Sequence, residues 1–507
     1  MLGDLRRSNR RTARLAVAGG ATLFGTLVSV IALTHRTIWL DETATIAAST
    51  RSWHAFGELV GEIDLVHAAY YVLMHCWFDL VGYSPFALRF PSALAIGVAT
   101  GLLVLLAERL TSLATATVAA VVLPFVPVVA AAGTLGRSPA FELLLAVAAT
   151  LLLVRALDAA DARRHPAVVV AWWVAYALVA YLSVLVFLWA ALVVACHALS
   201  VLLRFLAAPR VRWVGLVGAA AAVVAAALAA VPFARAAVGQ AAQVDWLRPP
   251  SLRGAVESAW RLQFFDFSLV ETNRSFVTAV AVVAWLLVAV GVVAALRRRS
   301  DALVVLLPWL VLPTVALLAA SRFVTPVYVG RYLTFSAPAL AVLVAAGVVA
   351  LLPFVRGIVS GVLLLAFLVP AGQVWWSIRT APPKTTDLAS AARQLTEARR
   401  GEAEPAGLVL GKMRRPADQL TTAYPAATDG LRDLWTKTSA ADQGYFFARL
   451  HGAVNSAADT EGLRTVWYVG DDPGEGAKVA AVLRGEGFTA HEPLGFGGSN
   501  VIVEYTR

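Results

Sequence analysis

The sequence predicts a helical protein that crosses a membrane many times and ends in a small soluble α/β domain. Of its 507 residues, 59% are hydrophobic and 15% are charged, whereas soluble domains carry about 25% charged residues. The apolar residues come in blocks of about twenty, the length that a helix needs to cross about 30 Å of hydrocarbon. From about Thr380 onward the composition changes to that of a soluble domain.

The apolar blocks divide residues 1–379 into about 11 expected membrane helices. A mean hydropathy of +0.73 agrees with this membrane assignment. Because 167–203 is almost uninterrupted, its division at Tyr181-Leu182-Ser183 rests on length alone, and the count is open by one. The expected spans are 14–34, 90–107, 112–132, 138–155, 167–181, 184–203, 213–234, 276–296, 302–320, 331–352 and 357–377.

Basic residues between these blocks predict the orientation, since cytoplasmic loops of membrane proteins collect Lys and Arg. With a cytoplasmic N-terminus, every compact basic cluster lies on the cytoplasmic side, and the loops 35–89 and 235–275 lie outside with everything after about 378. The net charge of +10 then indicates anchoring at anionic lipid and no nucleic-acid binding. The clusters are Arg6-Arg7 with Arg10-Arg11, Glu108-Arg109, 155–165, 204–212, Arg297-Arg298-Arg299 and Arg356.

Residues 380–507 are expected to form the outer α/β domain, after a linker at Pro382-Pro383. Amphipathic and buried-strand patterns define its elements. A role in acceptor recognition and a stabilising or partner-binding role fit this sequence equally well. The expected elements are helices at 387–400 and 477–484 and strands at 407–410, 465–469 and 501–503.

The loop 35–89 carries the candidate chemistry. Two adjacent acids soon after the first span are tolerated where the loop reaches water. The loop is rich in Trp and Tyr, which favour the headgroup level, so it is predicted to be helical and to lie along the membrane interface. Its candidate site residues are Asp41 and Glu42, then Asp64 and His67, then Tyr70 and Tyr71.

These residue types suit the transfer of a group from a phosphate to a hydroxyl. A carboxylate such as Asp41 can take the proton of an attacking hydroxyl, which contributes about 10²–10⁴-fold to a rate. Negative charge grows on a departing phosphate and is stabilised by preorganised cations. Arg137 and Arg331 are both predicted at outer ends of spans, and arginine binds phosphate through two donors at once. A divalent metal cation held by Asp64, His67 or Glu42 would serve the same purpose.

Glu142 is a further acid of interest, because it lies about one turn inside its predicted span. An unpaired carboxylate facing lipid is costly. We therefore expect Glu142 to face the bundle interior with a partner. The second long outer loop, 235–275, is a candidate to cover the donor or admit the acceptor.

The motifs of the chain resemble the C-type (GT-C) glycosyltransferases, in particular the bacterial branch related to protein O-mannosyltransferases and lipid A aminoarabinose transferases. The resemblance covers roughly residues 35–340 in order. The motifs that carry it are Trp39-Leu40-Asp41-Glu42, Asp64-x-x-His67-x-x-Tyr70-Tyr71, Phe86-Ala87-Leu88-Arg89-Phe90-Pro91-Ser92, Gly136-Arg137-Ser138 and Gly330-Arg331-Tyr332-Leu333.

The resemblance implies an inverting transfer of a sugar, a mannose-like hexose or a pentose, from a polyprenyl-phosphate donor. The acceptor would be a cell-envelope glycan, glycolipid or protein at the outer face of the plasma membrane. The first acid of the family's loop motif corresponds to Asp41, which makes Asp41, with Glu42, the expected catalytic acid pair. Family members often continue the Arg137 turn as Arg-x-Tyr, whereas Pro139 and Ala140 follow here.

The same matches make Tyr332 an expected substrate-binding residue, together with Asp64, His67, Tyr70, Tyr71, Arg137 and Arg331. Simpler interpretations stand beside these roles. An acid pair after a span is commonly a solvated helix cap, a lone histidine is commonly hydrogen-bonded at the interface, and arginines near helix ends extend to lipid headgroups.

Two other kinds of protein remain open. The first is a transporter or flippase for a lipid-linked substrate, although we see no repeat of the first half in the second, as many transporters show. The second is a non-catalytic scaffold with the same fold, which would tolerate loss of Asp41.

Overall fold

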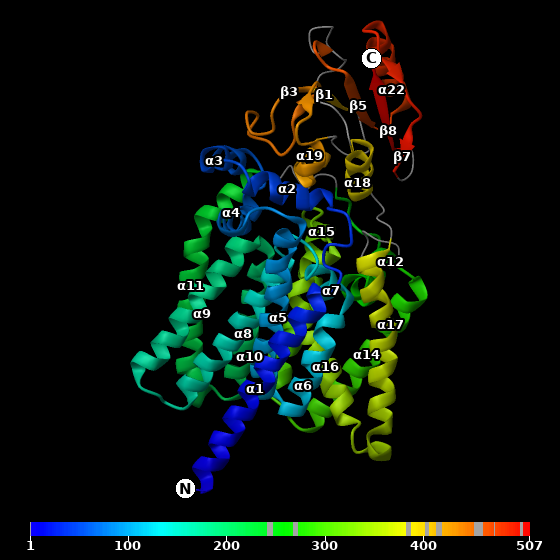
Figure 1. The fold of residues 1–507 in the computed structure, drawn as a ribbon. Helices are drawn as coiled ribbons and strands as arrows, with labels where there is room; N and C mark the ends of the chain where they lie inside the picture. The colour runs from blue at the N-terminus through cyan, green and yellow to red at the C-terminus, as the bar shows by residue number, and fades with distance from the viewer. Residues whose placement is uncertain are drawn as a thin grey trace. The chain divides into compact units, whose positions relative to one another are not determined.

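The structure, a computed structural model, describes residues 2–240, 247–266, 272–381, 387–400, 405–411, 418–450, 460–470, 472–496 and 500–507. The chain forms two compact units, drawn in Figure 1. Two segments of the stretch that leads from α1 (Leu2–Val30) into α5 (Pro85–Leu110) group with the C-terminal residues. Unit 1 holds Met1–Leu33, Asp64–Tyr70 and Arg89–Ala381, and unit 2 holds Thr34–Ile63, Tyr71–Leu88 and Pro382–Arg507.

Among the described residues, 10 helical segments are long and apolar enough to cross a membrane, which confirms the predicted polytopic helical fold. Several begin at proline, for example at Pro139, Pro166 and Pro209, because the first turn needs no backbone N–H. Figure 1 shows them side by side. They are α1 (Leu2–Val30), α5 (Pro85–Leu110), α8 (Pro139–Asp161), α9 (Pro166–Val186), η3 (Leu188–Ala190) with α10 (Ala191–Ala207), α11 (Pro209–Gly239), α14 (Arg274–Arg297), α15 (Ala302–Phe323), η6 (Gly330–Ser336) with α16 (Ala337–Ala350), and α17 (Ile358–Thr380).

The predicted block 112–132 is not one continuous helix. It consists of α6 (Leu113–Val122), the 3-10 turn η2 (Leu123–Phe125) and α7 (Pro127–Ala132). Pro124 lies in the turn and Pro127 starts α7. A proline inside a helix removes a hydrogen bond and clashes with the preceding turn, so the helix stops and restarts here.

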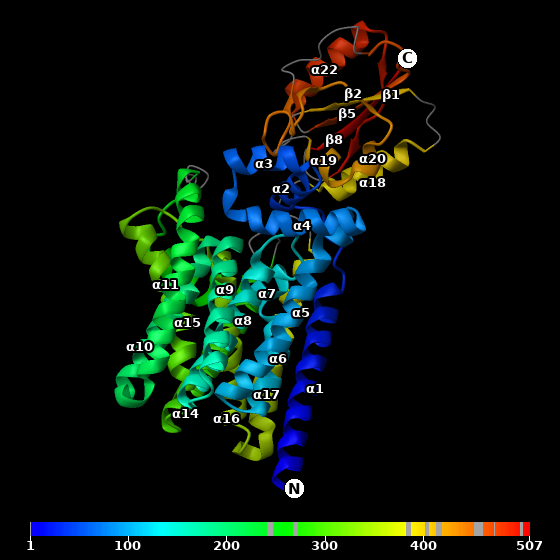
Figure 2. The ribbon, with the colours of Figure 1, turned by 90° about the vertical axis from the view of Figure 1, so that its left-hand side faces the viewer.

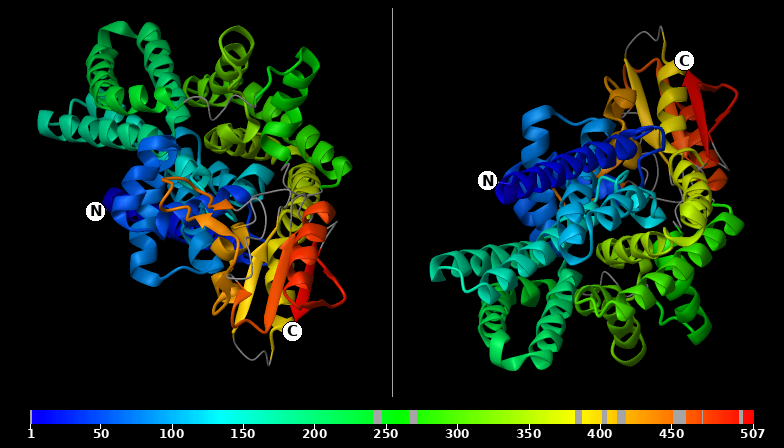
Figure 3. Two further views of the ribbon diagram at one scale, coloured as in Figure 1. Left: turned by 90° about the horizontal axis from the view of Figure 1, so that it is seen from above. Right: turned by 90° about the horizontal axis from the view of Figure 1, so that it is seen from below.

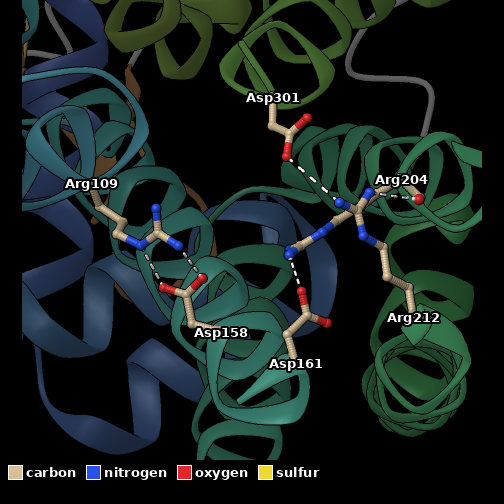
Figure 4. Close-up of polar contacts among 6 residues, drawn as sticks. All are labelled: Arg109, Asp158, Asp161, Arg204, Arg212 and Asp301. Carbon is tan, nitrogen blue, oxygen red and sulfur yellow. Dashed lines mark hydrogen bonds and ion pairs between the residues drawn. The ribbon is translucent and has the colours of Figure 1, made fainter. Parts of the chain in front are cut away.

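Ion pairs join helices at one end of the bundle (Figure 4). Two of them connect the C-terminal ends of α5, α8 and α10, and a third joins the N-terminal end of α11 to the residue before α15. Arg212 of α11 also donates to the backbone oxygen of Arg204 at 3.0 Å, which links the two groups of helix ends. The basic segments that the sequence predicts to share the cytoplasmic side therefore lie together. The pairs are Arg109 with Asp158 (2.6 and 2.7 Å), Arg204 with Asp161, and Arg212 with Asp301 (3.8 Å).

A buried histidine links α8, α9 and α10, which lie together in the end-on views of Figure 3. Nε2 of His197 is 2.9 Å from Oγ1 of Thr150, and Nδ1 is 3.2 Å from the Tyr176 hydroxyl. All three side chains are buried. Polar contacts of this kind tie helices together where lipid offers no alternative partner.

Glycines allow α14 and α16 to approach closely. A Cβ atom on Gly347 would lie 2.1 Å from the carbonyl oxygen of Leu287, and one on Gly291 would lie 2.4 Å from that of Leu343. Neither distance is physically possible. Small residues at such positions let membrane helices pack backbone to backbone.

Unit 2 contains a mixed sheet, which confirms the predicted small α/β domain. The strand order is β2-β1-β5-β8-β6, with β7 also paired to β8. β1 is parallel to β2 and β5, whereas β8 is antiparallel to β5, β6 and β7. The strands are β1 (Ala406–Leu410), β2 (Arg432–Asp433), β5 (Thr465–Gly470), β6 (Thr489–Ala490), β7 (Leu494–Gly495) and β8 (Val501–Thr506); β3 (Thr436–Thr438) and β4 (Arg449–Leu450) form a separate antiparallel pair.

Helices cover both faces of this sheet, as Figure 2 shows. Alternate residues of the strands, such as Val466 and Tyr468, pack with Leu483 of α22. The other residues of these strands are buried as well, so both faces need cover. The helices are α22 (Pro473–Gly485) on one side, and α18 (Leu388–Ala398), α19 (Gln419–Ala423) and α20 (Pro425–Thr428) on the other.

Burial raises the pKa of Asp418 in unit 2 to about 6, although the backbone N–H of Ala448 donates to its carboxylate at 2.5 Å. Between about pH 4 and pH 6, Asp418 keeps its proton in the folded state but has lost it in the unfolded state. The free energy of unfolding therefore falls as pH rises through this range, by about 3 kcal/mol from this group. We expect Asp418→Asn to raise the melting temperature of the full chain at pH 7 and not at pH 4. Thermal unfolding across this range measures the difference.

The exposed Asp429, in the same unit, provides the matched control. Asp429→Asn removes the same charge from a solvated position and should leave the pH profile of melting unchanged. An equal effect of the two substitutions would show that net charge, and not burial of Asp418, sets the pH dependence.

Candidate functional site

The first turn of α2 (Leu40–Ser49), in unit 2, carries both Asp41 and Glu42. Carboxylates are favourable there because the positive end of the helix dipole lies close. Glu42 is fully buried, and its Oε2 accepts a hydrogen bond from the backbone N–H of Trp39 at 3.0 Å. This contact is half of a capping box. Asp41 is half-buried, so it is the acid of the pair that has access to the surface.

C-terminal residues hold the start of α2 within unit 2. The backbone N–H of Ile38 donates to the hydroxyl of Tyr424 at 3.0 Å, and that of Ala389 donates to Oγ1 of Thr37 at 3.0 Å. Helix α19 packs against α2. The helix that carries Asp41 is therefore positioned by residues far away in the sequence.

We expect Tyr424→Phe to loosen the start of α2, because it leaves the Ile38 N–H without this acceptor, a loss of about 1–3 kcal/mol if no water replaces it. Hydrogen exchange at Ile38 should become faster by at least about fivefold. Tyr445→Phe, which removes a hydroxyl from an exposed ring of the same unit, is the control and should leave this exchange unchanged. Equal exchange in wild type and Tyr424→Phe would mean that the hydrogen bond does not hold α2.

The two tyrosines of the predicted motif are both fully buried. Tyr70, in unit 1, packs edge-on against Phe141 with ring centroids 5.8 Å apart. Tyr71, in unit 2, packs against Phe446 at 6.3 Å, and its backbone oxygen accepts from the hydroxyl of Ser49 at 3.2 Å. The ring of Tyr70 is part of the packed interior of unit 1 and that of Tyr71 is part of the interior of unit 2, so neither ring is open to a ligand in this structure.

Asp64 and His67 lie together in unit 1. Nδ1 of His67 is 3.1 Å from Oδ1 of Asp64, with both side chains partly accessible. Asp64 precedes the 3-10 turn η1 (Leu65–His67) and has φ 62° and ψ 28°, a left-handed conformation that Asp tolerates better than most residues. The side chain of Gln240 accepts from the backbone N–H of Leu65 at 2.8 Å, which fixes the turn.

Phe187 connects this pair to the late motif. Its ring lies 6.4 Å from the ring of His67 and 5.4 Å from that of Tyr332. The guanidinium of Arg331 lies 5.9 Å from the centroid of the Tyr332 ring. Within unit 1, Phe187 thus bridges His67, which pairs with Asp64, and Tyr332, which lies beside Arg331, although some 260 residues separate the two motifs in the sequence.

Arg331 lines a cavity of about 180 Å³ in unit 1. Most of the apolar part of the wall comes from residues 128–139, which run from α7 to the start of α8, and Leu262 and Val329 complete it. The polar part comes from Ser258, Asp266 and Thr334, and the hydroxyl of Thr272 donates to Oδ1 of Asp266 at 2.9 Å. A cation and a carboxylate thus face one small space, which suits a polar ligand with a phosphate or hydroxyl groups.

Neighbouring polar residues position the segment before Arg331. The hydroxyl of Ser321 accepts the backbone N–H groups of Val327 and Tyr328, at 2.9 and 2.7 Å. Oε1 of Gln263 accepts the hydroxyl of Tyr328 at 3.3 Å, and burial raises the pKa of Tyr328 to about 12, so this donor keeps its proton. A Cβ on Gly330 would lie 3.2 Å from Cα of Gln263, which explains the glycine.

Arg137 and Glu142 lie at the start of α8, which packs against η6. The hydroxyl of Ser92 donates to the backbone oxygen of Arg137 at 3.4 Å. Glu142 is 1% exposed and accepts from the hydroxyl of Ser138 at 2.6 Å. The acid therefore faces the interior with a hydroxyl partner, as its position in the sequence indicates.

The predicted metal ligands Asp64 and His67 supply one carboxylate and one imidazole. No cluster of three or more His, Cys, Asp or Glu side chains that could hold a metal ion occurs among the described residues. Magnesium often takes one or two carboxylates from the protein and the rest of its ligands from water and substrate phosphates. The pair fits this incomplete kind of site and not a closed protein cage.

The fold and these sites define a class: a polytopic helical membrane protein with a C-terminal α/β unit and a mostly apolar cavity whose wall carries Arg331 and Asp266. Among solved structures, the chain resembles ArnT from Cupriavidus metallidurans in the apo state, with a TM-score of 0.57 and 13% identity over 98% of both chains. It also resembles the same protein bound to undecaprenyl phosphate, with a TM-score of 0.51 and 13% identity over 98% of both chains.

A second similar protein is the mycobacterial arabinofuranosyltransferase AftD, with a TM-score of 0.55 and 16% identity. The match covers 97% of this chain and 39% of AftD. ArnT and AftD are GT-C superfamily members, so the chain has the GT-C fold, as its motifs predicted. By sequence, no protein-family model and no curated protein matches it.

Several supporting residues carry no signal in the sequence. Tyr424, Gln263, Ser321 and Thr334 belong to no motif, and their roles depend on which distant segments the fold brings beside them. The chemistry-bearing residues, by contrast, lie in short motifs with recognisable spacing.

Proposed function

We propose that the protein is a membrane glycosyltransferase that moves a sugar from a polyprenyl-phosphate donor to a hydroxyl group of an acceptor. The observation that carries the proposal is Asp41, a surface-accessible carboxylate in the first turn of a helix that is hydrogen-bonded in place. Similarity in fold to ArnT, which has been crystallised with undecaprenyl phosphate, supports a lipid-linked donor.

In the proposed reaction, the acceptor oxygen attacks the anomeric carbon from the side opposite the phosphate. The bond between that carbon and the phosphate oxygen breaks, and the electron pair leaves with the polyprenyl phosphate. Asp41 takes the proton of the acceptor hydroxyl as general base. A single displacement of this kind inverts the configuration at the anomeric carbon.

Arg331 is proposed to bind the phosphate. The leaving group changes from a phosphodiester to a monoester, so its negative charge grows, and a preorganised guanidinium stabilises that charge. The position of Arg331 on the wall of a cavity supports the role. Arg137, just before the N-terminal end of α8, is proposed to add a second positive charge where the helix dipole also favours an anion.

The remaining motif residues have supporting roles in the proposal. Tyr332 holds the guanidinium of Arg331 by its ring face, while Tyr70 and Tyr71 act through packing. Asp64 and His67 line the site for the donor phosphate; if a divalent cation is required, this pair would hold it and the cation would neutralise the phosphate. Glu42 caps α2 beside the catalytic acid.

In this proposal the reaction occurs on the extracytoplasmic side, and the distribution of basic residues supports that orientation. The end of the bundle that carries Arg109, Arg204 and Arg212 would be cytoplasmic by the positive-inside rule. The N-terminus would then lie inside and the C-terminal domain, residues 380–507, outside, provided that the broken segment α6-η2-α7 crosses the membrane as an eleventh span beside the 10 long helical segments. In a bacterial plasma membrane, the acceptor would be a glycan, glycolipid or protein of the cell envelope, and the sugar mannose, another hexose or a pentose.

A transfer assay tests this function. The protein in nanodiscs would receive polyprenyl phosphate carrying radiolabelled mannose or arabinose, together with an envelope glycolipid extract. We expect label in a new product and release of polyprenyl phosphate, and a loss of transfer in EDTA would indicate a metal. Movement of labelled donor between leaflets of proteoliposomes without any transfer would contradict the proposal and favour a flippase.

A further inference from the structure

A second, basic hollow lies in unit 1, on the part of the second outer loop that leads into α14. It has a volume of about 560 Å³. Three arginines and one glutamate line it, so three positive charges stand against one negative charge. The lining residues are Leu252, Arg253, Val256, Glu257, Trp260, Arg261, Arg274 and Thr278.

The cations of this hollow are held in place. Arg261 is buried, with 8% of its side chain exposed, and it forms an ion pair with Glu257. Arg274 contacts the same carboxylate at 3.4 Å and is 79% exposed. The hydrogen bond from Arg261, with the other guanidinium groups nearby, holds the pKa of Glu257 below its usual range. One carboxylate therefore organises the arginines without neutralising them.

A π-helical turn lies beside the hollow, and a hydrogen bond ties this turn to α14. Residues Ser258–Leu262 form the π-helical turn η5, which follows α12 (Leu252–Glu257). The carbonyl oxygen of Trp260 in this turn accepts a hydrogen bond from the indole N–H of Trp285, in α14, at 2.6 Å. The two elements that line the hollow are thus tied together, and π-turns are frequent at functional sites.

The hollow adjoins the end of a membrane helix and has apolar flanks. Arg274 is the first residue of the membrane-spanning helix α14, and Thr278 lies one turn further in. Leu252 and Val256 are 84% and 58% exposed. Arginines beside exposed apolar side chains match a ligand that has a phosphate and acyl chains, whereas a soluble anion leaves the apolar flanks in water.

We propose that this hollow binds the phosphate of an anionic phospholipid headgroup from the surrounding bilayer. Arg253 and Arg274 contact the phosphate, Glu257 with Arg261 keeps Arg274 oriented, and Leu252 and Val256 lie against the acyl chains. This hollow is distinct from the cavity lined by Arg331. Both take residues from the segment 252–266, but the cavity uses Ser258, Leu262 and Asp266, and none of these three lines the hollow. It is also independent of the proposed sugar transfer.

Native mass spectrometry tests the proposal on the full chain, after extraction from nanodiscs of mixed phosphatidylglycerol and phosphatidylcholine. We expect the wild type to retain phosphatidylglycerol preferentially. Arg253→Gln with Arg274→Gln should reduce that retention roughly tenfold or more, given the contribution of each arginine near anionic lipid. Arg432→Gln with Arg484→Gln, at exposed positions of the C-terminal α/β domain, removes the same charge and should leave retention unchanged.

Equal retention in the wild type and the Arg253 and Arg274 variant would overturn the proposal, as would equal loss in the control. Displacement of the lipid by excess inorganic phosphate would reassign the hollow to a soluble anion. If the variant does not fold, the wild type still decides the question. Its melting temperature must be higher in phosphatidylglycerol nanodiscs than in phosphatidylcholine nanodiscs, and no difference refutes the site.

Discussion

Replacing Asp41 with asparagine is expected to reduce the rate of sugar transfer at least about a hundredfold, because an amide cannot take the proton of the acceptor hydroxyl. Asparagine has nearly the same size and is also accepted in the first turn of a helix, so α2 should keep its position. The measurement is the turnover rate of the purified protein in nanodiscs, at saturating donor and acceptor. Melting temperature and donor binding should stay close to those of the wild type.

Two further substitutions make the result specific. Glu42→Gln keeps an oxygen that can accept the Trp39 N–H, so the cap survives and activity should fall by less than about tenfold. Glu62→Gln neutralises an exposed acid of the same loop and should have no effect. A hundredfold loss in Glu42→Gln, with an active Asp41→Asn, would move the role of base to Glu42; full activity of both variants would exclude this acid pair.

Replacing Arg331 with glutamine is expected to lower kcat about a hundredfold, the usual effect of removing one donor to a developing negative charge. Arg331→Lys keeps the charge but loses the bidentate hydrogen bonding that matches phosphate. Its kcat should therefore lie between that of Arg331→Gln and that of the wild type. Steady-state kinetics with a polyprenyl-phosphate donor separate the effect on kcat from the effect on KM.

Arg322 offers the matched control for Arg331. It lies at the end of α15, is exposed, and has its guanidinium 5.9 Å from the ring of Phe323. Arg322→Gln should leave kcat within about twofold of the wild type. If Arg331→Gln raised KM alone, the residue would bind the donor equally in ground and transition states, and its proposed part in stabilising the leaving group would be wrong.

The membrane part of the fold was predictable because a bilayer leaves few choices. A block of about twenty apolar residues must satisfy its own backbone hydrogen bonds, and a helix does so. The prediction of one unbroken helix at 112–132 was wrong, because a block defined by its apolar residues takes no account of Pro124 and Pro127. The hydrogen bonds of His197 and the close approach of α14 and α16 at Gly347 depend on which helices become neighbours. Hydropathy carries no information about that choice.

The candidate site was predictable to the extent that chemistry is encoded in short motifs. Asp64 and His67 meet because they are three positions apart on a tight turn. The burial of Tyr70 and Tyr71 was not predictable, since an aromatic ring suits a ligand surface and a packed core equally well. The capping role of Glu42 has a local signal, the spacing from Trp39 to Glu42, but Trp is not a usual residue at that position.

The hydrogen bond between Ile38 and Tyr424 spans 386 residues of sequence, and this separation bears on how the protein is made. The ribosome completes α2 early in translation, whereas Tyr424 emerges after every membrane helix has been synthesised. A polypeptide released before that point can insert its helices but lacks the partner that anchors α2. The last sixth or so of the polypeptide thus completes the support of a helix from its first tenth, so the protein would mature only late in its translation.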